Sequence, residues 1–234
     1  MRSRVLALLA LICVLIIIIF MTPAFFMGEA FKGRIIDEAT GKPVQGAVVV
    51  ASWPLQTEIG GFHPSTITTI NIEVMEAVTD HNGYFMFPAW GPKLNTNLDA
   101  MRSGNPFLLV FKRGYLFNLE QNLDGGRMKP RRWQIVQRSD WNGKMILLKP
   151  NNYENDPTQY QFSGFQYLHN MLEDVVWTGV AWGERERRCY AERVSNMIAE
   201  YSAQRSRYVS LGIDPKIYNP IDRAVEQDVI CKNG

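Results

Sequence analysis

The chain has 234 residues, and its 25 basic and 23 acidic side chains leave a formal net charge of +2. A charge this small argues against a nucleic-acid-binding protein, so we expect no nucleic-acid partner. The length is enough for two modest folded units, each with a small core of its own.

The N-terminus joins two basic residues to a long apolar run. Arg2 and Arg4 precede an uncharged stretch over residues 5–21, and residues 23–27 extend it. The run is close to the roughly 20 residues that span a bilayer, and basic residues ahead of it favour a cytoplasmic N-terminus. We predict a transmembrane signal anchor over residues 5–27, in a bacterial inner membrane with the remainder in the periplasm. Alternatively, Gly28-Glu29-Ala30 suits a signal peptidase, and cleavage after Ala30 gives a secreted protein.

Residues 31–87 have the pattern of short strands. Phe31–Ile36 is expected to form a short strand and Ala47–Ala51 an apolar strand, with a polar turn over residues 40–43 between them. Residues 53–65 contain Gly-Gly and are expected to form a long loop. Apolar and polar residues alternate over 70–74, which predicts a half-buried strand. Asn82-Gly83 predicts a two-residue type I′ turn into the next strand.

Residues 88–150 continue the strand pattern with a second interruption. Residues 88–106 are rich in Pro, Gly and Asn and are expected to form another long loop. An apolar strand follows over Phe107–Lys112 and ends at Gly114-Tyr115. The last strand is expected over Lys144–Leu148, where Pro150 stops it.

Two motifs carry a resemblance to a known family. Gly41-Lys-Pro-Val-Gln-Gly46-Ala47 is followed by Thr79-Asp80-His-Asn-Gly83-Tyr-Phe85. This pattern resembles the carboxypeptidase regulatory-like domain, a small antiparallel, transthyretin-like β-sandwich found as an accessory module on many exported proteins. The resemblance covers residues 31–150 and implies a non-catalytic scaffold or binding module. A fibronectin-like or bacterial-adhesin sandwich is the competing fold.

From residue 151 onward the apolar period becomes helical, so we predict a separate helical domain over residues 151–234. Phe165, Leu168, Leu172 and Val175 form one stripe, and residues 190–201 carry a second. Gly212 is expected to end the second helix. The helix starts that we expect are Asx-Pro pairs at Asp156, Asp214 and Asn219, and a short final helix covers residues 221–229. The overall fold class is therefore α+β, with 1–30 as signal anchor or signal peptide.

The ectodomain has two cysteines, Cys189 and Cys231. Two cysteines in an oxidising compartment usually form one bridge, which predicts a disulfide. Two buried thiols remain the alternative.

No pattern in the sequence predicts catalysis. The chain has three histidines and no His-Glu-x-x-His or nucleophile-elbow motif, so we expect no enzyme, no metal and no cofactor. His81 is expected in a solvated turn. His169 and Glu173 are one helical turn apart and are expected to form a surface pair.

Aromatic and basic residues in the loops are the candidates for a binding surface. Trp53, Phe62 and Trp90 are expected to be exposed in the long loops. Arg131, Arg132 and Trp133 lie in a basic segment suited to an anionic ligand. We therefore predict a non-catalytic, membrane-anchored binding or assembly module with an envelope protein as partner. The alternatives are a carbohydrate- or peptidoglycan-binding protein with a glycan as ligand and, less favoured, an unrecognised hydrolase.

Overall fold

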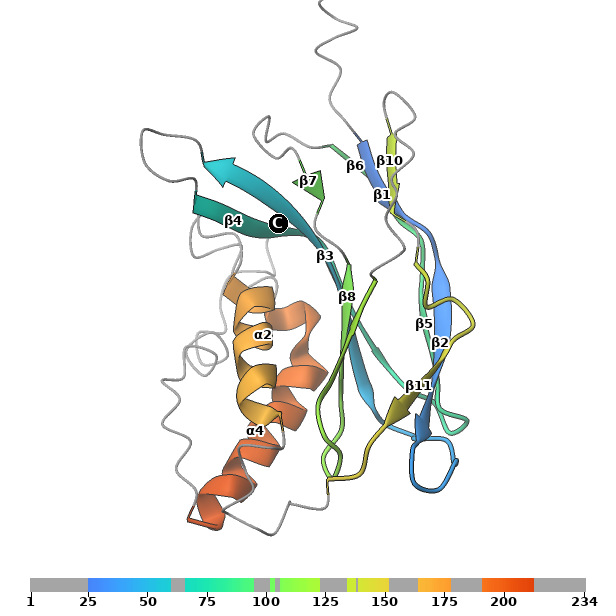
Figure 1. The fold of residues 1–234 in the computed structure, drawn as a ribbon, viewed down its shortest axis with the longest axis vertical. Helices are drawn as coiled ribbons and strands as arrows, with labels where there is room; N and C mark the ends of the chain where they lie inside the picture. The colour runs from blue at the N-terminus through green and yellow to red at the C-terminus, as the bar shows by residue number, and fades with distance from the viewer. Residues whose placement is uncertain are drawn as a thin grey trace, which may run out of the picture.

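A computed structural model describes residues 25–59, 66–94, 102–103, 106–122, 134–137, 139–151, 164–177 and 191–212. Within these ranges the chain forms a β-sandwich with a layer of helices on one of its faces (Figure 1). One layer of the sandwich consists of two short sheets in succession, and the other layer is a single larger sheet.

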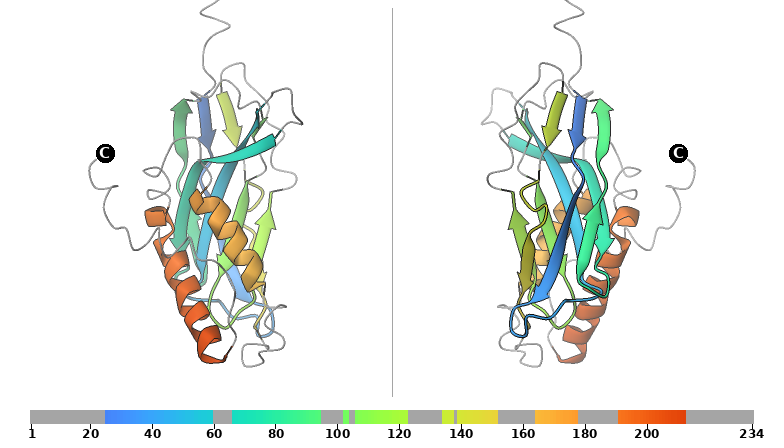
Figure 2. Two further views of the ribbon diagram at one scale, coloured as in Figure 1. Left: turned by 90° about the vertical axis from the view of Figure 1, so that its left-hand side faces the viewer. Right: turned by 90° about the vertical axis from the view of Figure 1, so that its right-hand side faces the viewer.

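The first layer consists of two short sheets. Strands that follow one another along the chain are divided between them, so that each sheet receives one strand of each pair. In one sheet the strand order is β10 (Gln134–Gln137), β1 (Phe25–Gly28) and β6 (Trp90–Leu94); in the other it is β11 (Met145–Leu148), β2 (Phe31–Asp37) and β5 (Tyr84–Phe87). Figures 1 and 2 show the β10-β1-β6 sheet above the β11-β2-β5 sheet. Strand β1 is parallel to β10, and β2 is parallel to β11. The sandwich is thus mixed, and the prediction of a purely antiparallel sandwich is wrong.

The second layer is one sheet in which the longest strands form a hairpin. Its order is β4 (Thr66–Val78), β3 (Val48–Ile59), β8 (Phe107–Phe111) and β9 (Asn118–Gln121), with β7 (Arg102–Ser103) paired to β3. Strand β3 continues through most of the predicted loop 53–65, because Thr66–Ile70 is a run of β-branched residues that pairs with it. The predicted loop 88–106 likewise contains β6 and β7.

A bulge interrupts the β3–β4 hairpin where Pro54 enters β3. Trp53 pairs with Glu73 and Pro54 with Asn71, so that Ile72 is the extra residue of β4. Proline lacks the N–H that a regular ladder requires, and a bulge accommodates it. The alternation of apolar residues therefore changes phase: Ile72 packs into the sandwich core, whereas Val74 faces the helices.

The second sheet has a hydrophobic core on each of its faces. Val49, Ala51 and Val110 point into the sandwich, whereas the alternate residues Val50 and Leu109 point towards the helices. Strands buried on both faces are apolar at successive positions. The helices and the sheet thus share one core, which corrects the expectation that residues 31–150 and 151–234 have separate cores.

The helices that cover this sheet include, in the described ranges, α2 (Phe165–Trp177) and α4 (Ser195–Ser210). The stripe Phe165, Leu168, Leu172 and Val175 is fully buried, as its spacing predicted. Gly212, with φ at 78°, follows the end of α4. The start of α4 is capped from a distant strand, since Glu76 of β4 accepts hydrogen bonds from the backbone N–H groups of Asn196 and Met197 at 3.0 and 2.7 Å. A carboxylate at this end also opposes the positive end of the helix dipole.

The predicted transmembrane helix over residues 5–27 is corrected. Its last residues, from Phe25 to Met27, lie in strand β1, and Phe26 is buried in the sandwich core. In the part of the chain that the structure describes, no helix is long and apolar enough to cross a membrane. Residues 1–24 lie outside this part. Cleavage after Ala30 would remove β1 from the sheet.

The turn at Asn82-Gly83 also differs from its prediction. Strands β4 and β5 belong to different layers, so the turn is part of an arch between them. Gly83 alone of the two residues has positive φ, at 77°, which excludes type I′. The carboxylate of Asp80 holds the turn by accepting hydrogen bonds from the N–H groups of Asn82 and Tyr84 at 2.9 and 2.8 Å.

Candidate functional site

The two tryptophans predicted to be exposed are core residues. Trp53 is 2% exposed and Trp90 is 6% exposed, and their ring centroids lie 5.5 Å apart inside the sandwich. Gly28 makes room for the Trp90 indole, because a Cβ at this position would lie 2.1 Å from its Nε1. The prediction of a binding surface at Trp53 and Trp90 is therefore wrong, and the glycan-binding alternative loses both residues.

The other predicted site residues lie outside the described part of the chain. These are Phe62, Arg131, Arg132 and Trp133 of the predicted binding surface, and Cys189 and Cys231 of the predicted disulfide. Their roles stay predictions.

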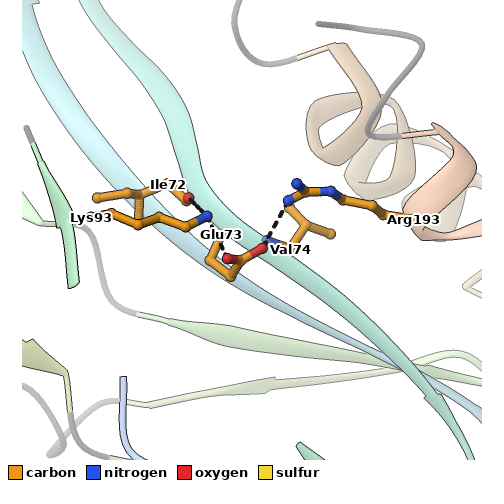
Figure 3. A network of polar contacts seen from close by, with 5 residues as sticks. All are labelled: Ile72, Glu73, Val74, Lys93 and Arg193. Atoms are coloured by element: carbon orange, nitrogen blue, oxygen red, sulfur yellow. Dashed lines mark hydrogen bonds and ion pairs between the residues drawn. The ribbon is translucent and has the colours of Figure 1, made fainter. Parts of the chain in front are cut away.

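A buried ion cluster joins both layers of the sandwich to the helical region. The Glu73 carboxylate, which is 9% exposed, contacts the ammonium of Lys93 on β6 and lies 2.8 Å from Nη1 of Arg193. Figure 3 shows Glu73 between these two cations. Lys93 also donates to the carbonyl of Ile72 at 3.0 Å and lies over the ring of Trp90 at 5.8 Å. Because two cations from different parts of the fold compensate the one Glu73 carboxylate, the cluster is suited to holding the layers together.

His169 lies beside Glu173, as their helical spacing predicted, but it is buried and not on the helix surface. Its Nδ1 lies 2.8 Å from the Tyr201 hydroxyl, and its Nε2 lies 3.8 Å from the Glu173 carboxylate. Burial raises the pKa of Glu173, and the charge of Asp174 raises it further. Burial likewise raises the pKa of Asp174. Adjacent helical residues point in different directions, so the two carboxylates do not converge on one reacting group.

Metal ligands are also not gathered in the described ranges. Across them, no group of three or more His, Cys, Asp or Glu residues could hold a metal ion. His81 is exposed in the Asp80–Gly83 turn, as predicted, and its Nε2 lies 2.9 Å from the side-chain amide of Asn82.

One carboxylate is held by a tyrosine between β2 and the end of β8. The Tyr115 hydroxyl donates to Oδ2 of Asp37 at 2.8 Å, while Oδ1 accepts from the N–H groups of Ala39 and Thr40. The bond from Tyr115, followed by that from the Thr40 backbone, lowers the pKa of Asp37. Burial, together with the bond to Asp37, raises the pKa of Tyr115 to about 12.

Tyr115→Phe should raise the pKa of Asp37 towards its ordinary value. A carboxyl group with a lowered pKa stabilises the fold at neutral pH, and this stabilisation is lost as the pH falls below about 4. The variant should thus lose less stability than the native chain between neutral and acidic pH. Titration of the Asp37 carboxyl carbon by NMR measures the change, with Tyr84→Phe as control. An unaltered Asp37 pKa in Tyr115→Phe would contradict this account.

Several exposed apolar side chains lie together on the outside of the β11-β2-β5 sheet. The side chains on this surface are Tyr84 and Met86 on β5, Lys32 and Arg34 on β2, and Met145 and Leu147 on β11; we call this set the outer face. Met86 and Met145 are 69% and 67% exposed. Isolated exposed apolar residues are common, but a contiguous group on neighbouring strands is typical of an interaction surface.

The strand register arranges the outer face in rows with a cation in the middle. Arg34 lies between Tyr84 and Met145, and Lys32 lies beside Met86. The Arg34 guanidinium lies 5.0 Å from the centroid of the Tyr84 ring and donates to the carbonyl of Asn82 at 2.8 Å. The outer face therefore combines an apolar periphery with a basic centre.

A hollow continues the outer face towards β4. It has a volume of about 410 Å³ and includes Val78, Tyr84 and Met86 in its lining, with Asp80 at its rim. Val78 is also exposed. In the part of the second layer whose side chains are described, helices α2 and α4 pack on the outer side.

Comparisons with known proteins do not assign a family. No protein-family model matches the chain, and no curated protein matches it. The resemblance to carboxypeptidase regulatory-like domains stays a prediction.

Solved structures with some similarity include two enzymes. A 3-chlorocatechol 1,2-dioxygenase from Rhodococcus opacus 1CP is 13% identical, with a TM-score of 0.29, over 55% of this chain and 61% of that one. A 9R-lipoxygenase from Cyanothece PCC8801 is 10% identical, with a TM-score of 0.25, over 76% of this chain and 25% of that one. The chain thus spans less than two thirds of either enzyme, and similarity at this level supports no conclusion about activity.

Proposed function

We propose that this chain is a non-catalytic binding module that assembles with another protein through the outer face. The observation that supports the proposal is the exposure of Tyr84, Met86, Met145 and Leu147 around Lys32 and Arg34. Apolar side chains supply affinity when a partner buries them, and matched charges fix the orientation of the partner.

Charge complementarity favours a partner with an apolar surface that carries Asp or Glu at its centre. Such carboxylates would lie opposite Lys32 and Arg34. A second copy of the chain is a poorer match, because two outer faces related by a two-fold axis would bring their basic centres together. Like charges placed opposite one another are destabilising.

Met86→Glu should weaken binding of this partner by roughly tenfold or more, because it introduces a charge into the apolar periphery. Lys32→Glu should weaken it through repulsion of the partner's carboxylates. The partner would be identified by crosslinking through a photoreactive residue at position 86 in the source cells, and its affinity measured after purification. Val209→Glu is the matched control, since Val209 is an exposed apolar residue on α4.

Replacing the partner's contacting Asp or Glu by Lys should restore its binding to the Lys32→Glu variant. The proposal would be contradicted if Val209→Glu lost as much affinity for the partner as the outer-face variants. It would also be contradicted if neither Met86→Glu nor Lys32→Glu changed the affinity of the purified partner. Crosslinking between copies of this chain alone, with a dimer in sedimentation, would replace the acidic partner by a second copy. All variants alter exposed side chains, so their unfolding midpoints should remain close to that of the native chain.

A further inference from the structure

The helical side of the molecule has an open groove that the proposed function does not use. Its volume is about 700 Å³. One wall is the segment Lys112–Gly114 after β8, and the other is formed by residues of α4 from Glu200 to Ser210. The volume lies within the range of roughly 300 to 1,000 Å³ that is typical of small-molecule sites.

The lining of the groove carries more positive than negative charge. Its cations are Lys112, Arg113 and Arg207, and its carboxylate is Glu200. Glu200 is matched by Arg113, which donates from Nε at 3.0 Å and from its backbone N–H at 3.4 Å. Lys112 uses one N–H to contact the carbonyl of Gln45, and an ammonium has three. The C-terminal carbonyls of α4 oppose an anion, so binding must rely on the cationic side chains.

The α4 wall also supplies hydrogen-bond acceptors. The hydroxyls of Ser206 and Ser210 donate to the carbonyls of Ser202 and Arg207 at 2.9 and 2.7 Å. Because the hydrogen of each hydroxyl is used in this way, its oxygen can act towards a ligand as an acceptor. A ligand with hydroxyl groups could donate to both.

The helix that forms this wall also carries a buried amide, which does not itself line the groove. Gln204 is 2% exposed, and within the described part of the chain neither its amide nitrogen nor its amide oxygen has a hydrogen-bond partner. Helical spacing places it one turn from both Glu200 and Arg207, which line the groove. Buried polar groups in native proteins are nearly always satisfied, so an unsatisfied one calls for a partner.

We propose that this groove binds a small anionic ligand that carries a carboxylate or phosphate group together with hydroxyl groups. Lys112 and Arg207 bind the anion, and Ser206 and Ser210 accept from the hydroxyls. The site lies on the helical side, away from the outer face, so its ligand and the protein partner would bind independently.

The test is isothermal titration of the full chain at low salt, with citrate and inorganic pyrophosphate as separate probes. Saturable binding of citrate would identify a carboxylate ligand, and saturable binding of pyrophosphate a phosphate ligand. Arg207→Gln and Lys112→Gln should each weaken binding about tenfold, the effect of losing one hydrogen bond to a charged group. Lys144→Gln should leave affinity unchanged, because Lys144 is exposed beside β11 in the other layer.

Two results would overturn the proposal. One is the absence of saturable binding of either anion to the native chain. The other is an equal loss of affinity in Lys144→Gln, which would reduce the effect to the overall charge of the protein. Arg207 is exposed, and an unchanged unfolding midpoint in Arg207→Gln would exclude misfolding as the cause of weaker binding.

Discussion

Leu172→Ala should lower the free energy of unfolding by about 3 to 5 kcal/mol, a typical cost of truncating a fully buried leucine. Leu172 lies on α2 with no exposed surface, in the core that the helices share with the second sheet. The truncated side chain would leave a cavity between Val175 and the sheet residues of that core. Urea unfolding at equilibrium measures the change.

Val209→Ala is the matched control for this prediction. Val209 is an apolar residue of the same helical layer, but it is 53% exposed, so its truncation should change stability by less than about 0.5 kcal/mol. If the helices and the sandwich were separate folding units, Leu172→Ala would destabilise the helices alone. The sandwich would then still unfold at its native urea midpoint. Two transitions in the Leu172→Ala variant would thus contradict the single core.

The double substitution Lys93→Met with Arg193→Met should destabilise the fold by about 3 kcal/mol, because it leaves a buried carboxylate without a compensating cation. Glu73 is nearly inaccessible to water, whereas the side chains of Lys93 and Arg193 are 35% and 46% exposed. Removing the two cations should therefore lower the free energy of unfolding by more than the loss of two partly exposed side chains would, because Glu73 stays buried and charged. Each single variant should cost less, since one cation would remain.

Adding Glu73→Gln to this double variant should restore most of the lost stability. Glutamine keeps the size of the side chain, still accepts a hydrogen bond from the N–H of Val74, and removes the unmatched charge. Comparison of the double and triple variants by urea unfolding isolates the carboxylate. A triple variant no more stable than the double variant would show that the cations act through packing.

The elements with a clear local pattern could be predicted. Strands β2, β8 and β11 lie where short segments that end in turn residues predicted strands, and α2 follows its stripe from Phe165 to Val175. The β3–β4 hairpin could not be recognised, because Pro54 and the Gly-Gly at 60–61 suggest a loop and no local feature reveals the bulge that accommodates the proline. Parallel pairing of Arg34 with Met145 joins distant segments and leaves no local signal either.

The candidate surfaces could not be predicted for a related reason. Strands β5 and β11 are apolar at every position, as in Tyr84–Phe87, so the sequence does not tell which alternate residues face solvent. The position of Trp53 and Trp90 in predicted loops suggested that they are exposed, but Gly28 instead leaves room for the Trp90 indole in the core. The groove depends on the approach of α4 to Lys112–Gly114, which only the folded chain brings about.

The cap that Glu76 provides for α4 has a consequence for the order of folding. The residue before α4 is Val194, which makes no side-chain cap, so the helix has no start signal of its own. Glu76 and Asn196 are 120 residues apart, which gives the contact a high contact order. Contacts between remote segments pay a large loop-closure cost and slow the search for the native state. During synthesis, α4 can therefore gain its cap only after residues 196 and 197 have left the ribosome, long after β4 has been made.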